Sequence, residues 1–231
     1  FAEVLAAAGA AVAIAARRRD RLDALSARIT AEGGNVLAVE MDVTDAASVE
    51  AALVAVESGL GPIEVLVNNA GVATAGNFLD TSEAEWRSVL GVNLDGVIRV
   101  SHAVAARMAK RGAGGSIVNL ASVLSFSVTS GLSAYAVSKA AVAQLTKAMA
   151  LDLARHRIRV NALAPGYFHS EMTNDLLASE RGKKMLAHYP MRRAGETGEL
   201  DIPLLLLASG AGSYMTGSVI TVDGGALLAG A

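Results

Sequence analysis

The chain has 231 residues, 52% of them hydrophobic and 18% charged, with a formal net charge of −2. The 20 basic and 22 acidic residues offer no basic field for nucleic acid, and no apolar run is long enough for a membrane span. The absence of cysteine excludes disulfides and thiolate sites, so together with an opening that shows no secretory leader it predicts a cytoplasmic protein.

Apolar periodicity and turn residues predict strands and helices in alternation. Short apolar runs predict strands at residues 10–16, 35–43, 63–71, 115–122, 158–166 and 218–225. Amphipathic runs predict helices at residues 1–9, 19–34, 44–59, 82–111, 134–156 and 197–209, and residues 167–196 are expected to be irregular. Thr44 or Asp45 is expected to cap the third helix, and Ser82 with Glu85 forms a capping box for the fourth.

Continuous apolar strands that alternate with helices indicate a parallel sheet covered on both faces. No linker or repeat divides the chain, so residues 1–231 are expected to form one Rossmann-like, doubly wound α/β domain. Ligands of such sheets bind outside the carboxyl ends of the strands. The segments just past the predicted strand ends are Ala16–Arg18, Asp42–Val43, Asn68–Gly71, Ser122 and Pro165–Ser170.

The stretch SAYAVSKAA places Tyr135 four residues before Lys139 in an Ala-rich helical run. Side chains four apart are neighbours on a helix, so the lysine charge should lie close to the tyrosine oxygen. A free tyrosine has a pKa of about 10, and a nearby cation lowers it. The pair predicts a proton donor and acceptor, although two such residues can also share a face by chance.

Several short motifs occur together in the order expected at strand ends. They are DV at 42–43, NNAG at 68–71, Asn93, Ser122, YAVSK at 135–139, PG at 165–166 and DGG at 223–225. With these residues the chain resembles the short-chain dehydrogenase/reductase family, from Phe1 nearly to the C-terminus. Only Tyr135 of the four tyrosines has a lysine four residues later.

The resemblance implies a role for each motif residue. Tyr135 would be the general acid or base, and Lys139 would lower its pKa and hold the nicotinamide ribose. Ser122 would bind the substrate oxygen, and Asn93 would hold a water in a proton relay. The alternatives are that Ser122 caps a turn, that the Asn93 amide bonds the backbone at a helix kink, and that NNAG is a plain turn. The residues expected to bind the cofactor are Arg17, Asp42, Val43, Asn69, Ala70, Gly71, Tyr135, Lys139, Pro165, Gly166, Phe168 and Ser170.

The implied activity is hydride transfer between a nicotinamide cofactor and a ketone or secondary alcohol, with residues of about 167–196 as the substrate loop. The similarity is to 3-oxoacyl-carrier-protein reductases and to sugar or polyol dehydrogenases. A catalytically idle nucleotide-binding relative is the alternative from another class, but such a protein should have lost the Ser–Tyr–Lys set. No metal is expected, because the four histidines lack ligand spacing.

The family's glycine-rich phosphate loop is absent from the sequence, and the chain opens inside the helix that this loop should precede. A first strand and the loop are therefore expected upstream of residue 1. Small residues at 97–108 and 140–151, with the apolar end GGALLAGA, predict a homo-oligomer, most simply a tetramer.

The end of the strand at residues 10–16 predicts which dinucleotide is preferred. An acidic residue there would accept the adenosine ribose hydroxyls of NAD, whereas a nearby arginine accommodates the 2′-phosphate of NADP. The strand ends at Ala16, and Arg17 and Arg18 follow. The sequence therefore predicts NADP(H), unless the arginines are a solvated turn with Asp20 capping the next helix.

Overall fold

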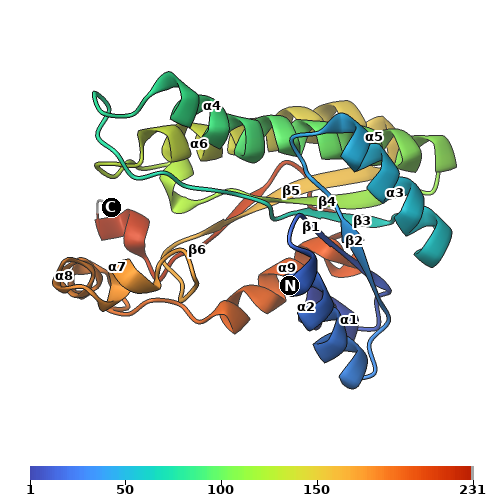
Figure 1. Ribbon diagram of the computed structural model, residues 1–231, viewed down its shortest axis with the longest axis horizontal. Coiled ribbons are helices and arrows are strands. Elements are labelled where there is room, and N and C mark those ends of the chain that lie inside the picture. Colours follow the sequence, from blue (N-terminus) through green and yellow to red (C-terminus); the bar gives the residue numbers. More distant parts are fainter. Residues whose placement is uncertain (230–231) are drawn as a thin grey trace.

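The computed structural model describes residues 1–229 and shows a parallel sheet between two layers of helices (Figure 1). The strands are β1 (Val12–Ala16), β2 (Val36–Glu40), β3 (Val65–Asn68), β4 (Gly115–Leu120), β5 (Ile158–Pro165) and β6 (Val219–Val222). All four strand pairings are parallel, and they join β1 to β2 and the other strands in the order β3-β4-β5-β6. The predicted doubly wound α/β fold is confirmed.

Helices cover both faces of the sheet. They are α1 (Ala2–Ala7), α2 (Arg19–Ala31), α3 (Ala46–Leu60), α4 (Glu83–Leu90), α5 (Gly96–Arg111), α6 (Ser133–Leu153), α7 (Asn174–Ala178), α8 (Glu180–His188) and α9 (Asp201–Ala208). Figure 1 shows α3 to α6 on one face and α1, α2 and α9 on the other, with α7 and α8 beyond the carboxyl end of β5. This arrangement leaves the carboxyl edge of the sheet lined by loops.

Within residues 1–229 the hydrogen-bonded ladder is interrupted between β1 and β3. Side-chain packing joins the two pieces instead. Leu5 of α1 packs against the core on either side of the break, and Met41 and Ile63 do the same on the opposite face. The strand expected upstream of residue 1 stays a prediction.

The core lies around β4 and β5, whose side chains are buried on both faces. Ile117, Val118, Val160 and Leu163 have no exposed surface. Burying such a side chain stabilises the fold by about 1.5–3 kcal/mol. This burial explains why these strands are mostly apolar on both faces; the polar side chains of Ser116, Asn119 and Asn161 are buried among them and hydrogen-bonded.

The structure confirms the predicted helix starts and refines one of them. Asp45, and not Thr44, is the N-cap of α3, because its carboxylate accepts a hydrogen bond from the backbone of Ala47 at 2.9 Å. Ser82 and Glu85 form the predicted capping box at the start of α4. The single helix predicted at 82–111 is kinked, since a π-helical turn, Gly91–Asp95, separates α4 from α5.

The segment predicted to be irregular, residues 167–196, contains two helices. Ser179 separates α7 from α8, and its hydroxyl accepts a hydrogen bond from the backbone of Gly182, the cap that starts α8. The prediction was wrong here because the run rich in Arg and Lys has few apolar residues to reveal a helical period. The predicted helix at 197–209 is also divided, into a 3₁₀ turn, Thr197–Leu200, and α9.

One helical stretch of the described residues, Glu83–Arg111, is long and apolar enough to cross a membrane by length and composition alone. In this fold its apolar side packs against the sheet, with Val104 and Met108 buried in the core. Core helices of globular proteins commonly have such a composition, so this stretch is explained by its place in the fold.

Candidate active site

The strand register brings the predicted segments to one edge of the sheet. Asn68 at the end of β3 lies opposite Asn119 of β4, and Leu120 lies opposite Leu163 of β5. The polypeptide after each of these strands therefore leaves the sheet on the same side. Helix α6 follows β4 and carries Tyr135 and Lys139 to this edge.

Ser122 and Tyr135 meet just past the end of β4. The Ser122 hydroxyl acts on the Tyr135 phenol and tends to lower its pKa, and only 7% of Ser122 is exposed. The Ser122 hydroxyl also accepts a hydrogen bond from the backbone of Leu124 at 3.2 Å, so it caps the short turn Val123–Ser125. The turn cap that the sequence offered as an alternative is therefore present, and the expected hydrogen bond from Ser122 to the substrate oxygen stays a prediction.

Lys139 is buried beneath Tyr135. Its Nζ donates a hydrogen bond to the backbone oxygen of Leu120 at 2.7 Å and lies 5.6 Å from the centre of the Tyr135 ring. Burial lowers the pKa of Lys139 from its usual 10.5 to about 8, because the charged form loses its hydration. The pairing of the two side chains expected from their spacing is present.

The expected lowering of the Tyr135 pKa is not observed. Burial raises the pKa of the phenol above its usual value, and the Ser122 hydroxyl opposes this only in part. Lys139 does not offset the burial, because its ammonium is directed to the Leu120 carbonyl. A phenol with a raised pKa keeps its proton, which suits a group that donates one.

Asn93 lies in the π-helical turn and is completely buried. Its side-chain oxygen accepts from the backbone of Val72 at 2.8 Å, and its Nδ2 donates to the carbonyl of Val72 at 2.9 Å and to the hydroxyl of Ser138 at 3.0 Å. The amide therefore bonds the backbone at a helix kink, as the sequence alternative stated. It links the loop after β3 to the helix that carries Tyr135.

The NNAG segment combines structural and site residues. Asn68 is buried and donates to Ser101 and Asn119, each at 2.8 Å, which ties β3 to α5 and β4. Asn69 and Ala70 are exposed at the edge. A Cβ on Gly71 would lie 3.5 Å from both Asn93 Oδ1 and Lys139 Nζ, so the glycine leaves the backbone open directly above these polar groups.

This arrangement fits the sugar next to a nicotinamide. An ammonium carries three donors, and the one hydrogen bond of Lys139 found within the described residues uses a single donor. The open backbone at Gly71 gives space for a polar group beside it. Lys139, Tyr135 and Gly71 are thus the residues that would hold the ribose.

The residues after β5 divide between the edge and the substrate loop. Gly166 must be a glycine, because a Cβ there would lie 2.8 Å from the Cα of Asp223. The ring of Phe168 is buried against Gly195, so its side chain belongs to the core of the loop rather than to an open cofactor surface. Ser170 bonds Thr173 at the start of α7.

Arg17 lies beside Asp42 at the end of β1. Hydrogen bonds from Thr44 lower the pKa of Asp42, and the positive charges of Arg17 and Arg99 lower it further. Ala16, the last residue of β1, carries no carboxylate itself, and its register partner on β2 is Glu40. Arg19 and Arg21 are ion-paired with Asp23 and Glu171, whereas no acidic side chain within the described part of the chain lies within 4 Å of the Arg17 guanidinium.

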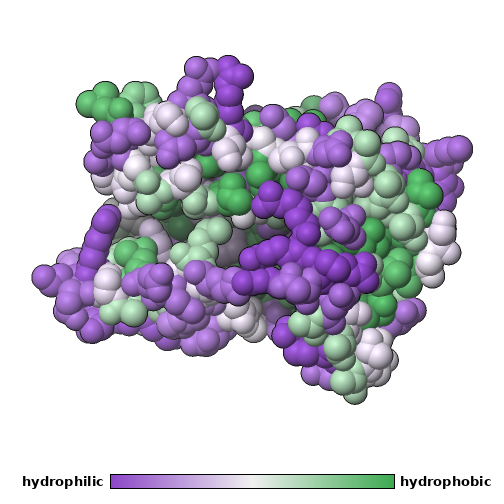
Figure 2. All heavy atoms as spheres, viewed as in Figure 1, coloured by the Kyte–Doolittle hydropathy of each residue, from purple (hydrophilic) through white to green (hydrophobic). Residues whose placement is uncertain are grey.

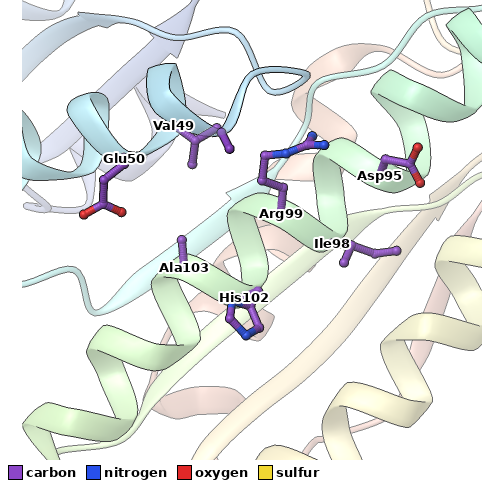
Figure 3. A pocket seen from close by; sticks show the side chains of 8 residues that line it. Val49, Glu50, Asp95, Ile98, Arg99, His102 and Ala103 are labelled. Carbon is purple, nitrogen blue, oxygen red and sulfur yellow. The ribbon is translucent and has the colours of Figure 1, made fainter.

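A cavity of about 290 Å³ lies near this site, because its lining residue Leu124 packs in the same apolar cluster as Tyr135 (Figure 2 shows the molecule hollowed between the α4–α6 layer and α7–α8). It is lined by Leu124, Thr129, Tyr167, Met185, His188, Tyr189 and Ala229. Burial raises the pKa of the Tyr167 phenol, and the nearby Thr129 hydroxyl opposes this in part. A second hollow, of about 520 Å³, lies away from this edge between α3 and α5 (Figure 3).

Sequence reasoning missed Ser138 and Thr129. Ser138 accepts from Asn93 and donates to the backbone oxygen of Tyr135 at 2.7 Å, so it positions the tyrosine within α6. Its only sequence signal is its place inside YAVSK. Thr129 carries no motif. Within residues 1–229 no three His, Asp or Glu side chains come together as metal ligands.

Comparison with known proteins finds similar dehydrogenases and reductases. The profile of the family described as Enoyl-(Acyl carrier protein) reductase matches residues 1–226. Gluconate 5-dehydrogenase of Gluconobacter oxydans is 39% identical over 97% of this chain and 88% of that protein. The 3-oxoacyl-(acyl-carrier-protein) reductase of Thermotoga maritima is 37% identical over 95% of this chain and 89% of its own. A crystal structure of gluconate 5-dehydrogenase from Burkholderia cenocepacia, in complex with NADP and tartrate, has a TM-score of 0.94 at 37% identity and covers 98% of this chain and 89% of that one.

The parallel sheet and the Ser–Tyr–Lys group at its carboxyl edge define an α/β oxidoreductase that uses a nicotinamide cofactor. The chain belongs to the short-chain dehydrogenase/reductase family. The fold, the family and the enzyme class predicted from the sequence are confirmed. Its reaction is oxidation of a secondary alcohol or reduction of a ketone.

Proposed function

We propose that Tyr135 passes a proton to or from a small polar substrate held in the 290 Å³ cavity. The observation that carries this proposal is the placement of Tyr135 next to Ser122, with the buried ammonium of Lys139 5.6 Å from the centre of the tyrosine ring. The cofactor would supply the hydride, and the protein would orient and polarise the carbonyl.

In the direction of reduction, Tyr135 donates its phenolic proton to the substrate oxygen. Ser122 donates a hydrogen bond to the same oxygen and stabilises the negative charge that develops there. Lys139 holds the ribose. Asn93 and Ser138 hold the part of α6 that carries Tyr135 in place. A water held near Asn93 would give a proton back to Tyr135 after the reaction.

The walls of the cavity favour a polyhydroxylated substrate. Tyr167, Tyr189, Thr129 and His188 can all donate or accept hydrogen bonds along it. A site built to bind hydroxyl groups rejects analogues that lack them, because its buried polar groups are then left unpaired. We therefore infer a keto sugar, sugar acid or polyol, the substrate class named for the gluconate 5-dehydrogenases.

A 3-oxoacyl thioester is the second candidate. Leu124 and Met185 line the same cavity and could contact an acyl chain, and the Thermotoga maritima relative is named for this substrate. Nicotinamide absorbance, followed across sugar acids, polyols and 3-oxoacyl thioesters, separates the two candidates. Turnover confined to the thioesters would overturn the polyol assignment, and none with any ketone or alcohol would favour the idle relative.

We infer a preference for NADP(H) from the end of β1. Arg17 is expected to bind the 2′-phosphate, because charge-assisted hydrogen bonds contribute about 1.5–3 kcal/mol. Arg17→Ala should raise KM for NADP(H) by about 10–100-fold and leave KM for NAD(H) almost unchanged.

The control for this experiment is Arg19→Ala, since Arg19 is already paired with Asp23 at 2.9 Å. The control should leave both Michaelis constants unchanged. A wild-type protein that favours NAD(H), or equal losses for both dinucleotides in Arg17→Ala, would show that Arg17 is only surface charge.

We propose that the protein is a homotetramer. Apolar side chains are exposed on the helices that cover one face: Ile98 on α5, Val137 on α6, and Leu151, which is 81% exposed, near the end of α6. Such surfaces on neighbouring helices mark interfaces between protein chains. Light scattering at micromolar concentration should give four times the chain mass, and Leu151→Glu should lower it. A wild-type monomer would contradict the proposal.

A further inference from the structure

The turn after β2 is held from outside by helix α5. Nη1 of Arg99 donates a hydrogen bond to the backbone oxygen of Val43 at 2.5 Å. One helical turn earlier, Gly96 is buried against the Val43 side chain, where an added Cβ would lie 2.8 Å from Val43 Cγ2. Two residues three apart on α5 therefore fix both the main chain and the side chain of Val43.

The same turn is also held from within. Asp42 accepts from the backbone and the hydroxyl of Thr44 at 2.8 and 2.7 Å, and its own N–H donates to Ser48 at 2.9 Å. These bonds are local and set the shape of the turn. Arg99 and Gly96 connect this turn to α5, and the backbone hydrogen bond from Met41 to Ala16 connects the end of β2 to the end of β1.

The Arg99 guanidinium bonds the backbone of Val43 although acidic residues lie near. Figure 3 shows Arg99 leaving α5 and reaching toward the segment that leads into α3, with Asp95 pointing another way and Glu50 across the hollow. Glu50 is ion-paired with Arg107. Within residues 1–229 no carboxylate lies within 4 Å of Arg99, so its donors are directed to a backbone carbonyl.

One side of this helix thus contacts two loops of the edge. Asn93 bonds Val72 in the loop after β3, while Gly96 and Arg99 contact Val43 after β2. Arg17, the proposed partner of the 2′-phosphate, is close enough to Asp42 for its charge to act on that carboxyl. The turn at Asp42–Val43 is therefore next to the adenosine end of the proposed cofactor site.

We propose that Arg99, with Gly96, is a positioning residue that sets the Asp42–Val43 turn for the adenosine end of the dinucleotide. This inference rests on the proposed cofactor function. It assigns no contact of Arg99 with the cofactor itself. Its effect is transmitted through the carbonyl of Val43.

The test is to measure binding of whole NADPH, of 2′,5′-ADP and of nicotinamide mononucleotide to the full chain and to Arg99→Met. Arg99→Met removes a hydrogen bond from a charged donor, so the affinities for NADPH and for 2′,5′-ADP should each fall by about tenfold. Binding of nicotinamide mononucleotide should not change, and kcat at saturating cofactor should stay within about twofold. Arg99→Lys, which keeps a charged donor, should recover part of the affinity.

His102→Ala is the matched control, because His102 lies on the same hollow one turn further along α5 and is exposed. It should bind all three ligands as the wild type does. Gly96→Ala, which pushes on Val43, should weaken 2′,5′-ADP in the same way as Arg99→Met. If Arg99→Met lowers thermal stability but leaves 2′,5′-ADP affinity intact, Arg99 is only structural and the inference is wrong. A wild type that binds no dinucleotide would instead overturn the proposed function.

Discussion

Tyr135→Phe is expected to lower turnover by about 10²–10⁴-fold, the usual contribution of a general acid or base. Burial raises the pKa of the phenol above its usual value, so it holds a proton at neutral pH. Phenylalanine keeps the ring and its packing but has no proton to donate. Dinucleotide affinity should therefore change little, and the loss should appear in kcat.

Tyr214→Phe is the matched control for this substitution, because Tyr214 is fully exposed and has no lysine four residues later. Both variants should be assayed with the best substrate of the panel, and their cofactor affinities measured by fluorescence titration. Wild-type turnover in Tyr135→Phe would remove the proton-donor role, whereas loss of cofactor binding would indicate damage to the site as a whole.

The fold could be predicted because its information is local. Strands β4 and β5 are buried on both faces, which leaves mostly apolar runs in the sequence, and Ser82 with Glu85 marks a helix start directly. Because the carboxyl ends of parallel strands lie at the same edge of a sheet, the sequence also predicted that Ser122 lies close to the helix that carries Tyr135.

What the sequence could not predict depends on contacts between distant residues. Lys139 is bonded to the carbonyl of Leu120, 19 residues earlier, so spacing along one helix misjudged its effect on the Tyr135 pKa. The hydrogen bond from Arg99 to the backbone oxygen of Val43 joins residues 56 positions apart, and no sequence motif predicts it. Helices α7 and α8 were missed because charged residues conceal their short apolar faces.

Lys139→Met is expected to have opposite effects on activity and on stability. Removing the ammonium proposed to hold the ribose should lower turnover by about 10²–10³-fold, as for loss of one preorganised donor in other enzymes. Lys139 has a relative exposure of only 5%, and no carboxylate among the described residues pairs with its ammonium. A buried unpaired charge destabilises a fold, so the apolar variant should gain stability at neutral pH.

The pH dependence of this gain identifies its cause. A fall in pKa from 10.5 to about 8 corresponds to roughly 3 kcal/mol against the charged form. Below pH 8 Lys139 is protonated in both folded and unfolded protein, and the folded state bears the whole penalty. Between about pH 8 and 10.5 the folded state releases its proton first, so the stability of the wild type rises with pH.

The free energy of unfolding should therefore be measured for cofactor-free wild type and Lys139→Met by urea denaturation at pH 7, 9 and 10.5. The advantage of the variant should shrink by roughly 3 kcal/mol across this range. A neutral Lys139 amine can still donate to the Leu120 carbonyl. The variant therefore lacks this hydrogen bond relative to the wild type at every pH, and its loss changes the stability difference equally at all three pH values. Lys147→Met, on the exposed side of α6, should show no such trend. A constant difference between wild type and Lys139→Met would mean that Lys139 is not an unpaired buried cation.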